Sequence, residues 1–361
     1  MKRILITIFL FIFIAANAVN FYIKTGGNDA YTSLSNAQAW ATITKVNSSF
    51  SQLTAGDSIL FNRGDTFTGT ITVAHSGSIG NPIVIGAYGI GDNPIITGFT
   101  MITGWTNVGG GIYSKAVTCA SLPNMVTVDG VNTSMGRWPN TGWRTISSCP
   151  NTTTITDATL PSSPNWDGAK VVIRKNHWTI DCNTISKHSG TTITYANASS
   201  FNAIVGYGYF IQNDIKTLDI LGEWYYNSVT STFYMFFGVV DPTTKTVKVA
   251  TLDKIISNMA SPYYSYITLD NLNLQGANTR IVDIRSSSYF TIQDCEIGYS
   301  GEFGIYGYSN SGTNANYFTL KNSTITECNN TPMYIASRFP EVSIRRIRQA
   351  VPLPMERGRS I

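Results

Sequence analysis

Three stretches in the second half of the chain align without gaps and decide the fold. They read YITLDNLNLQGA (266–277), YFTIQDCEIGYS (289–300) and YFTLKNSTITEC (317–328), at spacings of 23 and 28 residues. Spacings of this size are typical of repeat architectures. Within each stretch apolar and polar residues alternate, which predicts strands with one buried face. One repeat cannot bury its apolar face alone, so we expect the repeats to stack on one another.

Equivalent positions of the repeats form columns of similar residues. The apolar columns are Ile267/Phe290/Phe318, Leu269/Ile292/Leu320 and Leu274/Ile297/Ile325. Between them lies a polar column, Asn271/Asp294/Asn322. Asn tolerates the left-handed backbone of a sharp turn, and we expect the stacked side chains to hydrogen-bond along the column. The polar column therefore predicts a turn between two short strands in every repeat.

A further short strand follows in each repeat. Its sequence is RIVDIR (280–285), FGIYGY (303–308) and TPMYIA (331–336). Three strands per repeat, each paired in parallel with the next repeat about 4.8 Å away, enclose a continuous apolar core. We therefore predict an all-β protein, a right-handed parallel β-helix with three strands per coil. The chain is 12% aromatic and only 13% charged, which excludes a disordered chain and a long coiled coil.

With these repeats and their asparagine column, the chain resembles the pectate-lyase-like family of secreted, bacterial right-handed parallel β-helix proteins. The stretch YIKTGGNDA (22–30) is similar to the start of many bacterial members. The following AQAWATITKV (37–46) is expected to form an N-terminal helix that caps the first coil. The resemblance implies a polysaccharide partner, although this architecture hosts lyases, hydrolases, epimerases and adhesins.

These signals divide the chain into five parts. They are a signal peptide (1–18), an N-terminal cap with the first coils (19–100), a β-rich insertion or irregular coils (101–250), regular coils (251–337) and an atypical Arg-rich tail (338–361). The tail holds six Arg against two Glu and loses the β alternation. Two interpretations of the tail stay open: a basic extension that binds an anionic surface, and a frameshift or truncated gene end.

The first 18 residues predict export. Two basic residues precede the apolar run 4–16, and Ala16-Asn17-Ala18 offers a small-x-small cleavage site. We expect a secreted protein, extracellular or periplasmic, with no membrane span in the mature chain. Residues 19–337 carry 17 basic and 19 acidic side chains, so no nucleic-acid partner is expected. Five Cys without a Cys-x-x-Cys pair predict no zinc site and leave any disulfide pairing open.

In the resembled family the substrate lies along the sheet formed by one strand of every coil, here RIVDIR and its equivalents. The alternation turns these side chains outward on that sheet: Asp283, Arg285, Tyr306, Tyr308 and Tyr334. Tyrosine rings stack on the apolar faces of sugars, and charged groups bind hydroxyls or a uronate carboxylate. We therefore expect the three tyrosines to bind substrate. The alternative is a solvated sheet face whose tyrosines reflect ordinary β propensity.

A lyase that cleaves an acidic polysaccharide must neutralise the uronate carboxylate, remove the proton at C5 and protonate the leaving oxygen. We assign these catalytic roles to Arg285, Arg280 and Asp283. Asp283, Glu296 and Glu302 could also supply oxygen ligands to Ca²⁺, the one cofactor that we expect.

The segment Arg137-Trp138-Pro139 has two interpretations, a loop anchor and a substrate contact, since Arg and Trp are common contact residues. A glycoside hydrolase is disfavoured because the paired-Asp motifs and the Gly-His-Gly of polygalacturonases are absent. We therefore predict a secreted, monomeric, polysaccharide-active β-helix protein, an enzyme of the lyase type on an acidic polysaccharide. The alternative is a non-catalytic carbohydrate-binding or adhesive cell-surface protein.

Overall fold

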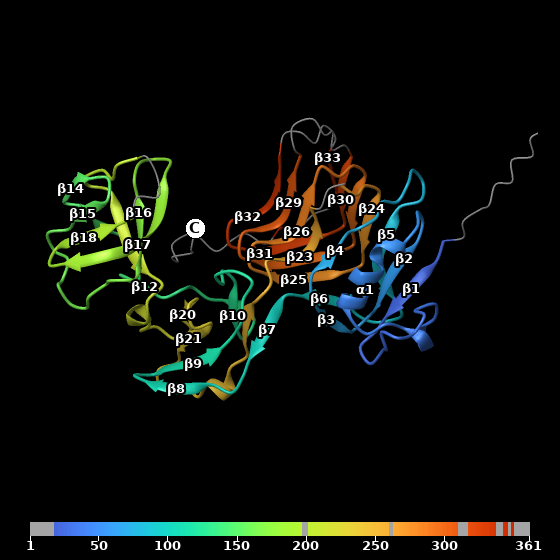
Figure 1. The fold of residues 1–361 in the computed structure, drawn as a ribbon, viewed down its shortest axis with the longest axis horizontal. Helices are drawn as coiled ribbons and strands as arrows, with labels where there is room; N and C mark the ends of the chain where they lie inside the picture. Colours follow the sequence, from blue (N-terminus) through green and yellow to red (C-terminus); the bar gives the residue numbers. More distant parts are fainter. Residues whose placement is uncertain are drawn as a thin grey trace, which may run out of the picture.

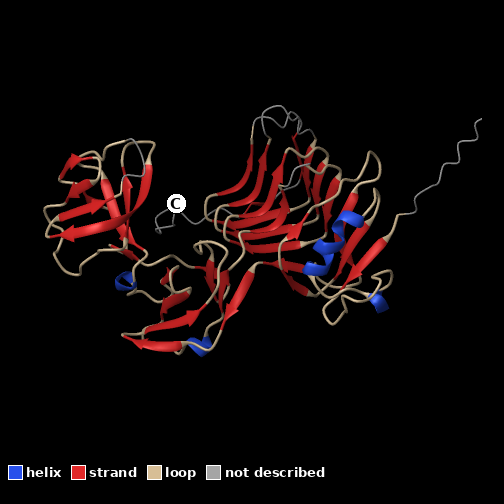
Figure 2. Cartoon of the chain, viewed as in Figure 1, coloured by secondary structure: helices blue, strands red, loops and turns tan. Residues whose placement is uncertain are grey.

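The computed structural model describes residues 18–196, 201–259, 263–309, 317–336, 342–345 and 348–349. The predicted signal peptide lies outside these residues except for Ala18. Figure 2 shows a molecule built mainly of strands, so the prediction of an all-β protein is confirmed. Short 3-10 helices join some of them: η1 (Asn36–Gln38), η2 (Phe50–Gln52), η3 (Ile215–Thr217) and η4 (Pro242–Thr244). Within the described ranges, no helix has the length and apolar character needed to cross a membrane.

Three parallel sheets form one side of the molecule (Figure 1). Sheet A contains β1 (Asn20–Ile23), β2 (Ser58–Asn62), β5 (Ile83–Tyr88), β24 (Ile267–Asp270), β27 (Phe290–Gln293), β30 (Phe318–Lys321) and β33 (Val342–Arg345). Sheet B contains β3 (Thr66–Thr68), β6 (Ile95–Thr97), β25 (Asn273–Ala277), β28 (Glu296–Ser300), β31 (Thr324–Cys328) and β34 (Arg348–Gln349). Sheet C contains β4 (Ile71–Thr72), β23 (Lys254–Asn258), β26 (Arg280–Arg285), β29 (Phe303–Tyr308) and β32 (Thr331–Ile335).

From β24 onward the chain visits sheets A, B and C in turn, and we call one such passage a coil. The register between coils is the one that the columns predict: Ile267 pairs with Phe290, and Phe290 with Phe318. Leu274 pairs likewise with Ile297 in sheet B. The repeats therefore pair in parallel with three strands in each coil.

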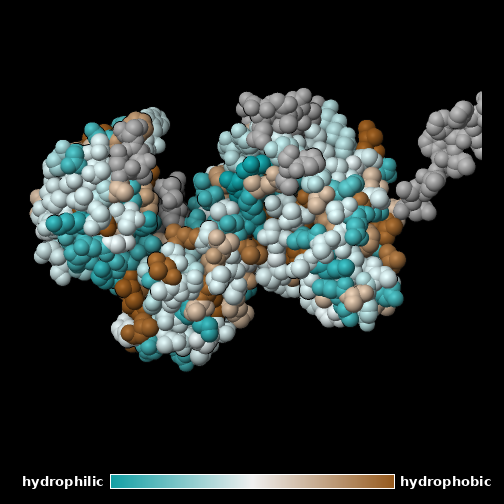
Figure 3. Space-filling model, in the orientation of Figure 1, coloured by the Kyte–Doolittle hydropathy of each residue, from teal (hydrophilic) through white to brown (hydrophobic). Residues whose placement is uncertain are grey.

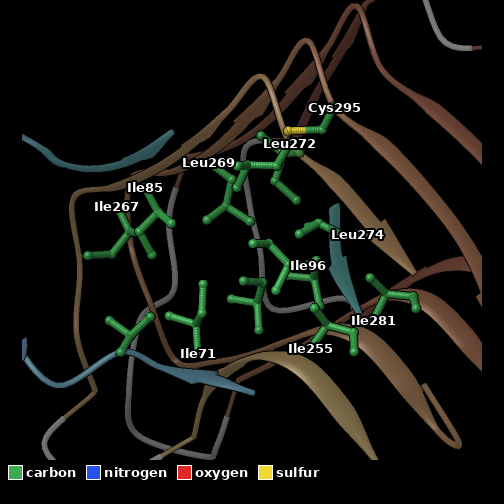
Figure 4. Close-up of a cluster of buried hydrophobic side chains, with 14 of the residues drawn as sticks. Ile71, Ile85, Ile96, Ile255, Ile267, Leu269, Leu272, Leu274, Ile281 and Cys295 are labelled. Carbon is green, nitrogen blue, oxygen red and sulfur yellow. The ribbon is translucent and has the colours of Figure 1, made fainter. Parts of the chain in front are cut away.

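The apolar core lies between the three sheets. Figure 4 shows Ile85 and Ile267 from sheet A, Ile96 from sheet B, and Ile71 and Ile255 from sheet C pointing into a common interior. All five side chains are fully buried. Burial of apolar surface contributes roughly 25 cal/mol per Å², so the stacking of coils supplies the stability that a single repeat lacks.

The predicted polar column forms the turn between sheets A and B. Asn271, Asp294 and Asn322 have φ angles of 56°, 53° and 49°, in the left-handed region that the column predicts. The hydrogen bonds observed at Asn271 differ from those expected along the column. The Asn271 side chain accepts from Arg63 Nη2 at 2.8 Å and donates to Asp270 at 2.8 Å, instead of bonding the next member.

A second left-handed column forms the turn between sheets C and A. Tyr266, Tyr289 and Tyr317 have φ angles of 59°, 56° and 60°. Their rings stack with centroids 4.5 Å apart at both steps. Aromatic residues rarely adopt this conformation, and the stacking from coil to coil offsets part of its cost.

Helix α1 (Ile43–Ser49) covers one end of the coils, as Figure 1 shows. It begins six residues later than the predicted 37–46, because Trp40 is extended and bridges Ile23, and Thr42 caps the helix through the Lys45 amide. The Asn47 side chain donates to the Thr70 carbonyl at 2.8 Å and accepts from the Thr72 amide at 2.9 Å. It thus satisfies backbone groups at the edge strand β4.

The segment between β6 and β23 forms two antiparallel lobes rather than irregular coils (Figure 1). The inner lobe holds β7 (Phe99–Ile102), β8 (Thr106–Gly109), β9 (Ile112–Ala116), β10 (Val126–Val128), β11 (Val131–Asn132), β20 (Trp224–Asn227), β21 (Thr232–Phe236) and β22 (Val247–Ala250). The outer lobe holds β12 (Arg137–Trp138), β13 (Arg144–Thr145), β14 (Ser148–Asn151), β15 (Thr154–Thr156), β16 (Lys170–Arg174), β17 (Ile180–Ser189), β18 (Thr192–Tyr195) and β19 (Gly208–Gln212). Each lobe has its own apolar core.

The insertion interrupts one coil. It begins after β6, the sheet B strand of that coil, and ends before β23, the sheet C strand of the same coil. The inner lobe contacts the matching turns of later coils. Asn124 Nδ2 donates to the Gly301 carbonyl at 2.7 Å, and Tyr299 Oη donates to the Gly130 carbonyl at 3.1 Å. The lobe therefore borders the turns that lead into sheet C.

Part of the predicted Arg-rich tail continues the coils. β33 pairs in parallel with β30, and β34 with β31. Residues 342–345 and 348–349 thus extend sheets A and B, which the loss of alternation in the sequence did not predict. The rest of the tail lies outside the described residues.

Candidate functional site

The outward face of sheet C gathers the residues that the sequence analysis singled out. Strand pairing places Ser257, Asp283, Tyr306 and Tyr334 in one column across β23, β26, β29 and β32. The column points away from the core because its neighbours on β26, such as Val282, belong to the core. We call this outward face of sheet C the sheet C face.

Asp283 occupies the centre of the sheet C face. Its Oδ2 accepts from Lys254 Nζ at 2.9 Å and from Arg280 Nη1 at 2.8 Å. The Asp283 side chain is 0% exposed, whereas each cation keeps 22% of its side chain exposed. Asp283 is therefore not the solvent-facing carboxylate that the alternation predicts. It points outward, but the longer side chains on both sides cover it.

The ring of Tyr306 lies between two other side chains. The Arg280 guanidinium carbon lies 3.8 Å from the Tyr306 ring centroid, and the Tyr334 ring stacks at 5.2 Å with an interplanar angle of 16°. Because β26 and β32 flank β29 on opposite sides, both faces of Tyr306 are covered. Tyr334 and Tyr308, which are 45% and 40% exposed, remain the rings that could stack on a sugar.

Three buried atoms of the sheet C face have no hydrogen-bond partner among the described residues. They are Nε of Arg280, Nε of Arg285 and Oδ1 of Asp283. Buried polar atoms in folded proteins are almost always paired with protein or water. The unpaired donors beside exposed tyrosines therefore point to a surface that is completed by water or by a polar ligand.

Two further carboxylates lie at the turns that lead into sheet C. Asp253 and Glu302 directly precede β23 and β29, and Thr279 lies between them: its amide donates to Asp253, and its carbonyl accepts from Glu302. Two strand spacings separate their backbones by about 9.5 Å. Burial raises the pKa of Glu302; Arg280 opposes this rise and Asp253 adds to it. A carboxyl group with a raised pKa beside a second carboxylate is a recognised acid–base arrangement.

The residues proposed as Ca²⁺ ligands are not brought together. Glu296 begins β28 in sheet B, where it accepts from Asn273 Nδ2 at 2.8 Å, while Glu302 lies beyond the other end of that strand. At about 3.3 Å per residue, the strand alone separates them by more than about 13 Å. Asp283 is already bound by two cations. Across the described ranges, no group of three His, Cys, Asp or Glu is placed to hold a metal ion, so these residues do not fit a calcium site.

Arg137 and Trp138 lie far along the insertion, on β12 of the outer lobe. The Arg137 guanidinium donates to the carbonyls of Pro139 and Gly142 and lies 3.9 Å from the Phe210 ring centroid. Only 5% of Arg137 is exposed. The geometry therefore agrees with the loop-anchor interpretation, because the guanidinium binds carbonyls of its own loop and packs on Phe210.

Lys254 and Asp253 are site residues that the sequence analysis missed. They precede the three aligned repeats, so the strand KIISN (254–258) was not recognised as an earlier sheet C strand. A signal was present: Lys254 and Arg280 are each followed by two apolar residues and a polar one. The pairing of Lys254 with Arg280 shows that this similarity is structural.

Comparison with known proteins supports the fold. Neither a protein-family model nor a curated protein matches the chain. A solved structure described as a glycoside hydrolase has a TM-score of 0.69 and 13% identity, covering 86% of this chain and 74% of its own. The complex of XylC with xylose has a TM-score of 0.51 and 12% identity, covering 91% of this chain and 58% of XylC. At these identities the likeness concerns the fold alone.

The pectate lyase Pel9A is also among the similar structures, with a TM-score of 0.36 and 10% identity. The matched region covers 87% of this chain and 41% of the Pel9A chain.

Proposed function

We propose that the protein is an exported polysaccharide-active enzyme whose substrate lies along the sheet C face of a single right-handed parallel β-helix. One observation carries the proposal. The sheet C face holds Lys254, Arg280 and Arg285 against the single buried carboxylate of Asp283, beside two exposed tyrosines. The excess of cations suits an acidic sugar chain, and the tyrosines suit its ring faces. The TM-score of 0.69 to a glycoside hydrolase supports a fold that hosts such enzymes.

The favoured reaction is elimination by a lyase. Arg285 forms no ion pair within the part of the chain that the structure describes, so we assign it to the uronate carboxylate of the substrate. Tyr308 pairs with Arg285 across the strands and is 40% exposed. We assign it to proton transfer. A proton leaves C5, the C4–C5 double bond forms, the C4–O bond breaks, and the leaving oxygen takes a proton.

Asp283 is then a positioning residue. Its carboxylate holds Lys254 and Arg280 in place, and Arg280 in turn supports the ring of Tyr306. Arg285 neutralises the carboxylate of the substrate, so no step needs Ca²⁺. We expect turnover to persist in EDTA.

A second candidate reaction is hydrolysis. Glu302 has a raised pKa, and its backbone lies about two strand spacings, or 9.5 Å, from that of Asp253. Inverting glycosidases pair a protonated carboxyl group with an ionised one that activates water. In this alternative Glu302 protonates the leaving oxygen and Asp253 activates water.

The test incubates the purified chain with polygalacturonate, alginate and a neutral glucan. The lyase proposal expects products with the ultraviolet absorbance of an unsaturated uronate, lost in Arg285→Ala and retained in the matched sheet A variant Lys321→Ala. New reducing ends without that absorbance, lost in Glu302→Gln, would establish hydrolysis. Binding without either product would indicate a non-catalytic sugar-binding protein. Equal behaviour of the wild type and Arg285→Ala in both binding and turnover would overturn the sheet C face as the site.

A further inference from the structure

The side chain of one tryptophan, at the tip of the outer lobe, is almost fully exposed to solvent. Trp178 lies in the hairpin between β16 and β17 and is 94% exposed. Burial of an indole in the core is ordinarily favourable by about 2–3 kcal/mol. An indole held in water on a folded domain is therefore a candidate contact for something outside the chain.

The hairpin holds Trp178 in a fixed backbone conformation. The Asn176 side-chain oxygen accepts from the Trp178 amide at 2.8 Å and from the Thr179 amide at 2.9 Å. The Lys175 amide closes the hairpin on the Thr179 carbonyl at 2.9 Å. A contact residue that is ordered in advance loses less conformational entropy when it binds.

A second segment completes the tip. The ring of His177, next to Trp178, meets Tyr207 edge to face at 5.7 Å, and the guanidinium of Arg174 lies 5.4 Å from the same Tyr207 ring. Tyr207 follows Ile204 and Val205, which are 43% and 56% exposed. The Arg174 guanidinium and the His177 imidazole thus meet at the Tyr207 ring, and Trp178 follows His177 directly in the hairpin.

We propose that this tip of the outer lobe is a second sugar-binding site, with Trp178 as the ring on which one sugar unit stacks. Arg174 and His177 supply donors for the hydroxyls or carboxylate at the edge of that sugar. The substrate class rests on the proposed function, because the same acidic polysaccharide is taken to occupy both sites. The outer lobe would then hold the polymer while the sheet C face acts on it.

The size and charge of the tip favour a sugar over a protein partner. An exposed indole offers about 150–250 Å², whereas a stable protein interface buries about 800 Å² on each partner. Figure 3 shows the visible face of the outer lobe as mainly white and teal. The guanidinium of Arg174, the last residue of β16 in the same hairpin, also complements the negative charge of a uronate.

The chain contains a matched control for Trp178. In the inner lobe, Val229 lies at the tip of the β20–β21 hairpin and is 93% exposed. There the Asn227 side-chain oxygen accepts from the Val229 amide at 3.0 Å and from the Thr230 amide at 3.2 Å. The two hairpins share this hydrogen-bond pattern and nearly the same exposure of the tip residue, and they differ in the side chain that they present.

The experiment measures binding of the full chain to long polygalacturonate and alginate, and to their short oligosaccharides. Trp178→Ala is expected to weaken binding to the long polymer about five- to tenfold, while Trp178→Phe restores part of it and Val229→Ala changes nothing. Binding of short oligosaccharides, which reach only the sheet C face, is expected to stay at the wild-type value. Sugar is also expected to protect Trp178 from acrylamide quenching, seen as the difference between the wild type and Trp178→Phe.

Unchanged polymer binding in Trp178→Ala, or quenching that sugar does not alter, would overturn this second site even if the sheet C face is active. If Arg285→Ala loses sugar binding and Trp178→Ala does not, the sheet C face is supported and the second site is overturned. The two proposals can therefore fail separately. Binding to phosphatidylglycerol vesicles that depends on Trp178 and ignores the polysaccharide would overturn the sugar assignment in favour of a membrane surface.

Discussion

Sheets A and C belong to the same coils, yet their outward faces are chemically different. On sheet A, Thr268, Thr291 and Thr319 alternate with a polar column in which Gln293 Nε2 donates to Asp270 Oδ1 at 3.0 Å. On sheet C the equivalent positions carry a buried carboxylate, two cations and stacked tyrosines. The winding of the chain fixes where side chains point, and the residues at those positions give the two faces their different chemistry.

The two faces also differ in how completely they satisfy their own polar atoms. Unpaired buried atoms among the described residues include Arg280 Nε, Arg285 Nε and Asp283 Oδ1 on sheet C, and none from the outward side chains of sheet A. A sheet that leaves buried donors unpaired accepts a cost in stability. Such a cost is typical of sites that gain their partners from a ligand.

The largest expected effect comes from removing the carboxylate at the centre of sheet C. Asp283→Ala leaves Lys254 and Arg280 partly buried without a counter-charge, so we expect a loss of about 3 kcal/mol in the free energy of unfolding. The matched change on sheet A, Asp270→Ala, removes the acceptor of two hydrogen bonds, from Asn271 Nδ2 and Gln293 Nε2, and should cost less, about 1–2 kcal/mol. Urea unfolding of the two variants measures both values. Equal losses of unfolding free energy in the two variants would show that the carboxylates of the two faces contribute alike to stability, contrary to this prediction.

An intermediate effect is expected from Arg280→Lys. Lysine keeps the charge beside Asp283 but loses the flat guanidinium that covers Tyr306. We expect affinity for acidic oligosaccharides to fall about three- to tenfold, since cation–π contacts contribute about 0.5–2 kcal/mol. Titration calorimetry measures the affinity, with Lys321→Arg on sheet A as control. Wild-type affinity in Arg280→Lys would show that the stack is not needed for binding.

The smallest expected effect is the pH-dependent contribution of Glu302 to the free energy of unfolding. The folded-state pKa of Glu302 is raised, so the folded chain holds this proton more tightly than the unfolded chain does. The ionised carboxylate therefore destabilises the fold above the folded pKa, and this cost fades as the pH falls toward the unfolded value of 4.5. Glu302→Gln should be slightly more stable than the wild type at pH 7 and no more stable at pH 4. Thermal unfolding at both pH values checks the sign, and a stability gain that grows on acidification would contradict it.

The sequence predicts the coils well because their geometry is local and repeated. The columns at Ile267 and Asn271 recur in every repeat, and both the register and the left-handed turn follow from them. The start of α1 was less predictable, because the extended bridge of Trp40 to Ile23 is a tertiary contact. No pattern within residues 37–46 reports it.

The candidate site is predictable only in part, for a related reason. Alternation places Asp283 and Tyr306 on one face, and the structure agrees. The burial of Asp283 depends on Lys254 from an earlier coil, which lies before the aligned repeats. The role of Arg137 depends likewise on Phe210 across the outer lobe. Contacts between segments that share no repeat leave no periodic signal.

Asn47 has a consequence for how such a protein can change in length. Its side-chain amide offers one acceptor and one donor to β4, as a neighbouring strand would. No further strand can therefore join sheet C at that edge, and a second copy of the chain cannot pair there. A coil gained by duplication must be accommodated away from α1, where each one would lengthen the sheet C face by about 4.8 Å. The sheet C face, the proposed binding surface, is thus open to growth at one end only, because Asn47 satisfies the β4 edge at the other.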